Sequence, residues 1–305
     1  MTNIEVSVII PCYNASEFIG DLLDSIIPQL NSSVEIILID DYSTDNTLTI
    51  LNNRLQGFNN CHVIENSYNQ GIGSSRNKGF LASKGNYIWF IDSDDVIKND
   101  SIENILESIK NEEHDVYCYS HTLINTLNNK VNKVIVDEGN CNNFDFLNKV
   151  LEKKMTFHLW NKVISRKAIG NTLADEKISI LVDKNFILKM LSARKLSFKA
   201  IDHDIYTYYL RCGSTVTKLT PKKLKDLQYT FKIFLKQCYD LNNTNINKYL
   251  VREKIRFSYQ VLKNGGDLEF KLPKIIELIN DKISFLDYFK FIYVLANETF
   301  KRSDN

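Results

Sequence analysis

The chain has 305 residues, of which 44% are hydrophobic and 25% are charged, and its formal net charge is +1. This composition is typical of a soluble globular protein with a sizeable core, and it excludes a nucleic-acid binder that relies on bulk positive charge. The charge is uneven, because residues 218–305 carry 17 Lys and Arg against 10 Asp and Glu.

Strands and helices alternate through the first 98 residues. Short apolar or β-branched runs predict strands, and apolar side chains at helical spacing predict helices between them. The predicted strands are Val6 to Pro11, Val34 to Ile39, His62 to Glu65 and Tyr87 to Ile91, and the predicted helices lie at 15–29, 44–55 and 71–83. This alternation is typical of an α/β protein with a doubly wound, mostly parallel sheet, whose ligands bind beyond the carboxyl ends of the strands.

The alternation weakens after residue 98. A predicted helix at 102–109 is followed by predicted strands at 116–121 and 131–136, with asparagine-rich connections. Beyond residue 220 the apolar spacing is helical nearly to the end of the chain.

Three carboxylates follow the fourth predicted strand, in the segment Asp92-Ser93-Asp94-Asp95. Like charges this close repel, so a fold keeps them together when a positive group lies between them. Carboxylate oxygens suit Mg²⁺ or Mn²⁺, which usually retain coordination sites for substrate phosphates. The segment therefore predicts a divalent-metal and nucleotide-diphosphate site, and a solvated turn is the simpler alternative.

The turn after the first predicted strand contains no glycine, since it reads Pro11-Cys12-Tyr13-Asn14-Ala15. Dinucleotide-binding folds place Gly-x-Gly-x-x-Gly there so that the backbone can approach a pyrophosphate. The nearest match begins at Gly71 and lacks the last glycine. This favours a metal-using nucleotide-sugar enzyme over an NAD-dependent dehydrogenase.

The six cysteines are far apart and form no C-x-x-C pair, which indicates free thiols in a reducing compartment. The N-terminal residues do not resemble a signal peptide, and no apolar run approaches the roughly 20 residues that span a bilayer. We therefore expect a cytoplasmic protein or one attached to the cytoplasmic face of the inner membrane.

Four short segments lie in order near the predicted strand ends. They are Ile9-Ile10-Pro11-Cys12-Tyr13-Asn14, Asp40-Asp41-Tyr42-Ser43-Thr44-Asp45-Asn46-Thr47, Asn69-Gln70-Gly71 with Arg76-Asn77-Lys78-Gly79, and Asp92-Ser93-Asp94-Asp95. Together they resemble the bacterial family 2 glycosyltransferases of the GT-A fold, including those that build O-antigen and capsule. The resemblance covers roughly the first 215 residues.

The resemblance implies a GT-A catalytic domain at 1–217, built on a Rossmann-like, doubly wound, mostly parallel sheet. Its nucleotide-sugar half is about 1–98 and its acceptor half about 99–217, and a helical, basic C-terminal extension occupies 218–305. An aromatic stripe at 285–296 predicts packing on the protein's own body, with a peripheral membrane contact of the C-terminal helices as the alternative.

The resemblance also implies residues for the base of the donor. Asp41 resembles the acidic residue that accepts a hydrogen bond from uracil, Tyr13 resembles the aromatic residue that stacks near the base, and Pro11 lines the same pocket. Helix capping is the alternative role for Asp41, and it is the favoured role for Asp45.

For the diphosphate, Asp92 and Asp94 correspond to the family's DxD element. Asp92 and Ser93 belong to the nucleotide-sugar site, with Asp92 near the ribose, and Asp94 holds the Mn²⁺ or Mg²⁺ with Asp92 beside it. Arg76 resembles a residue on the donor side. Arg211 could reach a phosphate as a bidentate donor.

Asp183 resembles the general base that takes the proton from the attacking hydroxyl of the acceptor. Val182 stands where the family usually has Glu, so a second carboxylate is lost. Two alternatives remain, namely that Asp183 caps a helix at 184–193 and that Asp175 is the base.

The acceptor side includes Trp160 and Asp95. A tryptophan at this place can stack on the C–H face of a sugar, but a core tryptophan is an equally good interpretation. His158 is expected to be a satisfied structural histidine.

The implied function is metal-dependent, inverting transfer of a hexose from a UDP-sugar to a glycan acceptor, with no nucleic-acid partner. An undecaprenyl-diphosphate-linked acceptor in O-antigen or capsule synthesis is the favoured hypothesis. Two alternatives belong to other classes: a nucleotidyltransferase on a similar sheet, and a non-catalytic nucleotide-sugar-binding protein.

Overall fold

The computed structural model describes residues 4–211 and a few helical positions beyond them, at 225–226, 228–229, 231–232, 255, 257–259 and 261–262. The chain divides into two compact units, Met1–Thr215 and Val216–Asn305. The first unit contains every strand and helix described between residues 4 and 211. The predicted domain boundary at 217 and the aromatic stripe at 285–296 lie outside the described residues.

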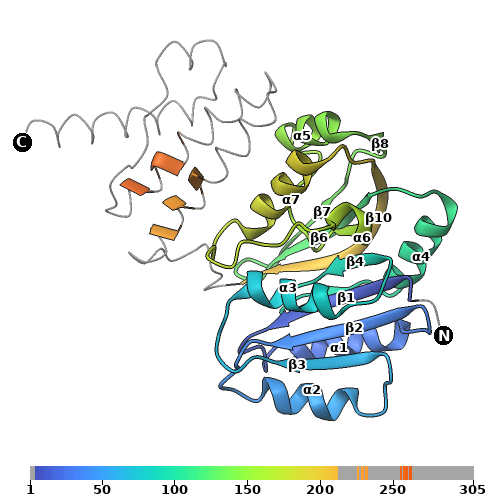
Figure 1. The fold of residues 1–305 in the computed structure, drawn as a ribbon, viewed down its shortest axis with the longest axis vertical. Helices are drawn as coiled ribbons and strands as arrows, with labels where there is room; N and C mark the ends of the chain where they lie inside the picture. The colour runs from blue at the N-terminus through green and yellow to red at the C-terminus, as the bar shows by residue number, and fades with distance from the viewer. Residues whose placement is uncertain are drawn as a thin grey trace, which may run out of the picture. The chain divides into compact units, whose positions relative to one another are not determined.

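The first unit is an α/β structure whose strands and helices alternate as far as β4 (Figure 1). The strands are β1 (Val6–Cys12), β2 (Val34–Asp40), β3 (Cys61–Glu65), β4 (Tyr87–Phe90), β5 (Val96–Ile97), β6 (Val116–Asn125), β7 (Lys130–Val134), β8 (Gly139–Cys141), β9 (Lys162–Ser165) and β10 (Phe198–Leu210). The helices are α1 (Ile19–Ile26), η1 (Ile27–Gln29), α2 (Thr47–Leu55), α3 (Ile72–Ala82), α4 (Ser101–Asn111), α5 (Asn143–Leu151), α6 (Arg166–Ile169) and α7 (Val182–Ala193).

All ten strands form one sheet in the order β3-β2-β1-β4-β9-β6-β10-β5, with β7 paired to β6 and β8 paired to β10. The run from β3 to β4 is parallel, as the alternation predicted. The antiparallel strand β9 joins β4 to β6. The two longest pairings, β1 with β2 and β6 with β10, are both parallel, which confirms the prediction of a mostly parallel sheet.

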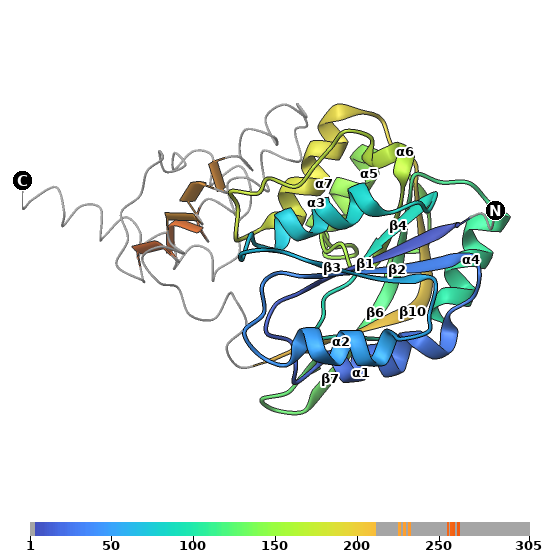
Figure 2. The ribbon, with the colours of Figure 1, turned by 60° about the horizontal axis from the view of Figure 1, so that its bottom comes forward.

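Helices cover both faces of the sheet, with α1 and α2 on one side and α3 and α7 on the other (Figure 2). On the α1 side, alternate residues of β1 and β2 are fully buried against apolar residues of α1, including Leu22 and Leu23. On the other side α3 lies so close to the sheet that a Cβ at Gly79 would be 2.7 Å from Ile39 Cδ1 and would also overlap Ile9. This close packing fixes α3 over the carboxyl ends of β1 and β2.

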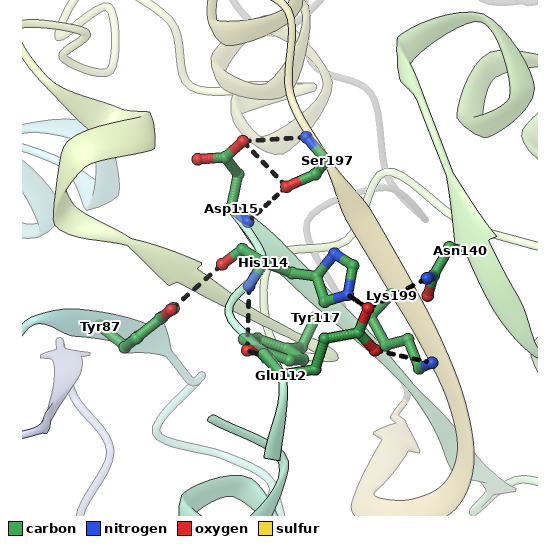
Figure 3. A network of polar contacts seen from close by, with 8 residues as sticks. All are labelled: Tyr87, Glu112, His114, Asp115, Tyr117, Asn140, Ser197 and Lys199. Atoms are coloured by element: carbon green, nitrogen blue, oxygen red, sulfur yellow. Dashed lines mark hydrogen bonds and ion pairs between the residues drawn. The ribbon is translucent and has the colours of Figure 1, made fainter. Parts of the chain in front are cut away.

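A polar network ties together the amino ends of β4, β6 and β10 (Figure 3). The hydroxyl of Tyr87 donates to the carbonyl of His114 at 3.2 Å, and Asp115 Oδ2 accepts the amide N–H of Ser197 at 2.9 Å. The ammonium of Lys199 lies 3.2 Å from Glu112 Oε2. These groups stabilise the edge of the sheet opposite to the carboxyl strand ends, so they belong to the scaffold.

The acceptor half contains three strands that the sequence pattern did not predict, β8, β9 and β10, and β8 lies where a connection was expected. The pairing of β10 with β6 has register shifts between Ile201 and Asp204 and between Asp204 and Thr207, which interrupt its alternation. In the described ranges no helix combines the length and the apolar character that crossing a bilayer requires.

Candidate active site

The candidate site lies at the carboxyl ends of β1, β2 and β4, where a parallel sheet places its ligands. The carboxylate segment 92–95 follows β4 directly, and the end of β10 lies beside it, since Tyr209 donates its backbone N–H to Asp95 Oδ1 at 2.8 Å. The site therefore combines residues from the first 98 positions with residues from the second half of the domain.

A buried arginine connects two of the predicted acidic residues. Arg76, on α3, is 4% exposed, and its two terminal nitrogens lie 2.6 Å from Asp183 Oδ1 and 3.0 Å from Asp92 Oδ1. Its Nε is buried and has no hydrogen-bond partner. One cation thus holds the DxD segment and the predicted base in a fixed relation, as charge-assisted hydrogen bonds do.

Asp183 is also bound on its second oxygen, because Oδ2 accepts the backbone N–H of Leu159 at 3.0 Å. Helix α7 begins at Val182 with Leu181 as its N-cap residue, and no side-chain capping bond is present there. Asp183 therefore lies in the first turn, and the structure does not support the capping alternative. Asp175, the rival base, accepts the N–H of Lys177 in its own turn at 3.1 Å.

The pKa of Asp183 is set by opposing effects. Burial acts to raise it, but the charges of Arg76 and His158 and the bound hydrogen-bond donors outweigh burial, so the pKa lies below its ordinary value. At Asp92 burial, together with repulsion by Asp183 and Asp94, outweighs the opposing charge of Arg76 and raises the pKa to about 6. Two carboxylates held by one arginine thus differ in proton affinity, a pattern that occurs at catalytic sites.

Asp95 has the environment of a structural residue, and its predicted acceptor contact has no support in the geometry. The residue is 1% exposed, and its carboxylate oxygens accept the hydroxyl of Tyr206 and the N–H of Tyr209, both at 2.8 Å. Burial and repulsion by Asp92 and Asp94 raise the pKa of Asp95 to about 8. The residue links the β4–β5 connection to β10.

Arg211 has the environment of an anion-binding residue. Its guanidinium carbon lies 4.3 Å from the ring centre of Phe18 and 4.6 Å from that of Tyr209. Nη1 is 3.5 Å from Asp94 Oδ2 and 3.9 Å from Asp95 Oδ1, and it is buried without a hydrogen-bond partner. A buried donor without a partner is costly, so a ligand oxygen would stabilise it.

The predicted metal residues fit a cation that arrives with its substrate. Within the described residues no group of three or more His, Cys, Asp or Glu side chains is arranged to hold a metal ion. Asp94 has a side chain that is 47% exposed, and Asp92, with 26%, lies close enough for its pKa to respond to Asp94. Mg²⁺ is commonly held by one or two carboxylates plus substrate phosphates, which is the donor set available here.

Asp41 organises the loop that leads into α3. Its Oδ1 accepts the side-chain amide of Asn66 at 2.7 Å and the N–H of Gln70 at 2.8 Å, and its Oδ2 accepts the N–H of Gly71 at 2.7 Å. Gly71 has φ 86°, a conformation that favours glycine. Because Oδ2 can accept a second bond, the uracil contact of Asp41 stays a prediction.

The neighbouring carboxylate of Asp40 was not assigned to the site. Its Oδ2 accepts the N–H of Ser43 at 3.0 Å, whereas its Oδ1 is buried without a partner. Sequence gives no signal that separates the two adjacent acids. Asp45 precedes Asn46, the N-cap residue of α2, and its Oδ1 accepts the N–H of Thr47 at 2.9 Å while its Oδ2 accepts the N–H of Ser16 at 3.0 Å.

At the end of β1 the accessible residue is Tyr13, which is 51% exposed. Pro11 is buried within β1, where it pairs with Ile39, and its place beside the base stays a prediction. Ser93 is half-buried beside the carboxylates. The donor-side residues predicted from the sequence therefore lie at one edge of the sheet.

Trp160 lies in the core, which favours the second of its two interpretations, and a sugar contact of this residue stays a prediction. It is 2% exposed, and the rings of His158, Tyr206 and Tyr208 stack on it at centroid distances of 4.9, 4.8 and 5.5 Å. The exposed ring of this group is His158, which was expected to be a satisfied structural residue.

Lys162 is a buried residue near the site to which the sequence analysis assigned no role. It is fully buried, and its ammonium donates to the carbonyl of His158 at 2.8 Å and to Asn161 Oδ1 at 2.9 Å. Burial lowers its pKa. These bonds shape the turn whose Leu159 N–H holds Asp183. The sequence shows only a lysine between Asn161 and Val163, a weak signal.

A mixed, mostly parallel sheet with carboxylates at its carboxyl edge is the architecture of the GT-A transferases. The family model described as glycosyl transferase family 2 matches residues 7–173, more than half of the chain, and the chain belongs to this family. The fold is shared with S. aureus TarS 1–349 in complex with UDP, at a TM-score of 0.64 and 18% identity over 96% of this chain and 79% of TarS 1–349.

Curated relatives include glycosyltransferases from Bacillus and Streptococcus. The chain is 26% identical to the uncharacterized glycosyltransferase EpsJ of Bacillus subtilis over 82% of its own length and 76% of EpsJ. It is 32% identical to GlyG of Streptococcus pneumoniae over 36% of its own length and 37% of GlyG. It is 37% identical to the poly(ribitol-phosphate) beta-glucosyltransferase of Bacillus spizizenii over 37% of its own length and 18% of that enzyme. The chain thus spans well under two thirds of GlyG and of the Bacillus spizizenii enzyme.

Proposed function

We propose that this protein is an inverting, metal-dependent glycosyltransferase that moves a hexose from a UDP-sugar to a sugar acceptor of a bacterial surface polysaccharide. The observation that carries the proposal is the bridge from Asp92 through Arg76 to Asp183. The bridge holds the carboxylate of Asp183 beside the DxD segment, and its lowered pKa keeps it ionised, which supports Asp183 as the proposed base next to the departing diphosphate.

The donor side of the proposal is supported by Arg211 and Asp94. Arg211 offers an unpartnered buried N–H, and Asp94 offers an exposed carboxylate 3.5 Å away, so the pair suits a phosphate together with its cation. TarS, which shares this fold, has been crystallised with UDP and with UDP-GlcNAc. The nucleotide we propose is therefore UDP.

In the proposed reaction Asp183 takes the proton of one acceptor hydroxyl as that oxygen attacks the anomeric carbon. The N–H of Leu159 and the guanidinium of Arg76 keep the carboxylate oriented throughout. Asp92 and Asp94 would hold Mn²⁺ or Mg²⁺, and when bound this cation neutralises the charge of the departing UDP. Attack from the face opposite to UDP converts an α-linked donor into a β-linked product.

For the acceptor we propose a glycan of cell-surface polysaccharide synthesis carried on undecaprenyl diphosphate. Two relatives are named for cell-surface polymers, one as a poly(ribitol-phosphate) beta-glucosyltransferase and one as the minor teichoic acid biosynthesis protein GgaB, which supports the surface-polysaccharide part of the choice. Such an acceptor would be met on the cytoplasmic face of the membrane, where the surplus of lysine and arginine in residues 218–305 would favour anionic lipid.

The test is release of UDP from a panel of UDP-sugars with Mn²⁺ and with EDTA, using a synthetic GlcNAc-diphosphate-lipid acceptor. We expect release with one sugar and none in EDTA. Asp183→Asn should keep UDP binding and lose turnover by about 10³-fold or more, whereas Asp175→Asn, the matched control, should remain active. Turnover by Asp183→Asn would refute the base, and pyrophosphate release from a nucleoside triphosphate and a sugar phosphate would identify a nucleotidyltransferase.

A further inference from the structure

Three strongly exposed tyrosines follow three adjacent strands at the donor edge of the sheet. Tyr13 comes after β1, Tyr42 after β2 and Tyr68 after β3, with exposed fractions of 51%, 54% and 63%. The three strands are parallel and lie side by side (Figure 1), so their carboxyl ends are at the same edge. Exposed aromatic side chains at the carboxyl edge of a parallel sheet, where ligands bind, are candidates for ligand contact.

Tyr42 is held in an unfavourable backbone conformation. Its φ is 65°, in the left-handed region that is rare for bulky residues. Strain of this kind persists where the surrounding structure enforces it, and it concentrates at ligand sites. Within the described part of the chain, the Tyr42 side chain has no hydrogen bond and no ring contact that would offset the cost.

The turn around Tyr42 is fixed by hydrogen bonds from both sides. The N–H of Ser43 donates to Asp40 Oδ2 at 3.0 Å, and the N–H of Thr44 donates to Asn14 Oδ1 at 2.8 Å. Asn14, itself at φ 48°, donates its N–H to Ser43 Oγ at 3.0 Å. The strained turns after β1 and after β2 are therefore hydrogen-bonded to each other, and the Tyr42 ring is held exposed to solvent.

We propose that Tyr42 is a base-contacting residue of the donor site, which extends the surface predicted for Tyr13; this assignment rests on the proposed function. Cys12 pairs with Asp40 in the β1–β2 ladder, so the turns that carry Tyr13 and Tyr42 start at the same level. Asp41, the predicted uracil contact, directly precedes Tyr42. A tyrosine ring stacks on the flat face of a nucleobase, and each such contact contributes substantially to affinity.

The decisive variant is Tyr42→Gly, because glycine relieves the backbone strain while it removes the ring. We expect the melting temperature of the full chain to rise by about 2 °C or more and UDP to bind about tenfold more weakly. Binding of ribose 5-diphosphate, which lacks the base, should not change relative to the native protein. Tyr42→Phe keeps the ring and should bind UDP as the native protein does.

Lys153→Gly is the matched control, since Lys153 is an exposed residue with φ 62° outside the site. It should also raise the melting temperature but leave UDP binding unchanged. Equal UDP affinity of Tyr42→Gly and the native protein would overturn the assignment. An altered KM for the acceptor, with UDP affinity unchanged, would overturn it as well and assign Tyr42 to the acceptor site. A lower melting temperature of Tyr42→Gly would show that the ring packs on the protein. If the native protein binds no UDP, the proposed donor itself is wrong.

Discussion

Arg76 and Asp183 are 107 positions apart in the sequence, yet their side chains form an ion pair with a nitrogen–oxygen distance of 2.6 Å. The same guanidinium bonds Asp92. Because Arg76 is 4% exposed, this charge is shielded from water and the ion pairs are stronger than surface pairs. The arginine therefore determines where the proposed base lies relative to the proposed metal residues.

Replacement of Arg76 by lysine should preserve the positive charge but lose the simultaneous ion pairs with Asp92 and Asp183. A lysine ammonium cannot hold two carboxylates in a fixed planar geometry. We expect kcat to fall by about 10²-fold, with a smaller change in the Kd for UDP, as measured by steady-state kinetics and by calorimetry. Arg54→Lys is the control, because Arg54 pairs with Asp24 on the surface and should have normal activity. Unchanged kcat in Arg76→Lys would refute the positioning role.

Asp94→Ala should remove the effect of metal on UDP binding. The native protein should be stabilised by Mn²⁺ and UDP together more than by either alone, since the cation would be shared between Asp94 and the diphosphate. Thermal melting with each ligand and with both would show this coupling. It should be absent in Asp94→Ala and intact in Asp24→Ala, where the replaced carboxylate is 66% exposed. Coupling that survives in Asp94→Ala would place the cation elsewhere.

His121 should make the protein less stable in acid. Burial, and then the positive charges of His158 and Lys162, lower its pKa from 6.5 to about 3. A group with a depressed folded-state pKa contributes stability that is complete above pH 6.5 and is lost as the pH falls toward 3. Between pH 6.5 and pH 5 this loss is about 2 kcal/mol.

Urea denaturation of the native protein and of His121→Phe at both pH values would isolate this contribution. Phenylalanine preserves the edge contact with Trp160, whose ring centre is 4.5 Å from that of His121. The loss of unfolding free energy between pH 6.5 and pH 5 should be about 2 kcal/mol smaller in His121→Phe than in the native protein. Equal losses in both proteins would mean that other groups cause the acid sensitivity.

Gly79→Ala should be strongly destabilising, because its Cβ would overlap Ile9 and Ile39 in a packed interface. Overpacking of this kind costs about 1–3 kcal/mol of unfolding free energy. Gly20→Ala is the opposite case, since nothing lies within 4 Å of its added Cβ in helix α1. It should stabilise the protein by up to about 1 kcal/mol. Thermal denaturation of the two variants tests whether α3 packs against the sheet as closely as the structure shows.

Much of the nucleotide half was predictable because its signals are local. The strands β1, β2 and β4 are short apolar runs, and their polar residues follow immediately at the carboxyl ends. The order of the motifs was therefore enough to predict Tyr13, Asp92 and Asp94 at one edge of the sheet.

The acceptor half depends on contacts between distant residues. The burial of Asp95 follows from Tyr206 and Tyr209 on β10, a strand whose register shifts obscure its alternation. Trp160 is covered by rings that lie up to 48 positions away, as with Tyr208. Whether an aromatic or acidic residue faces solvent at such positions is decided by tertiary packing, which no local pattern reports.

The indole of Trp89, on β4, donates to the carbonyl of Trp160 at 2.7 Å, and β4 continues through β9 into β6 without a break in the sheet. The two halves of the domain are thus joined by continuous main-chain hydrogen bonds between strands. Rotation of one half away from the other would rupture this ladder. We therefore expect substrates to bind without a hinge motion between the two halves.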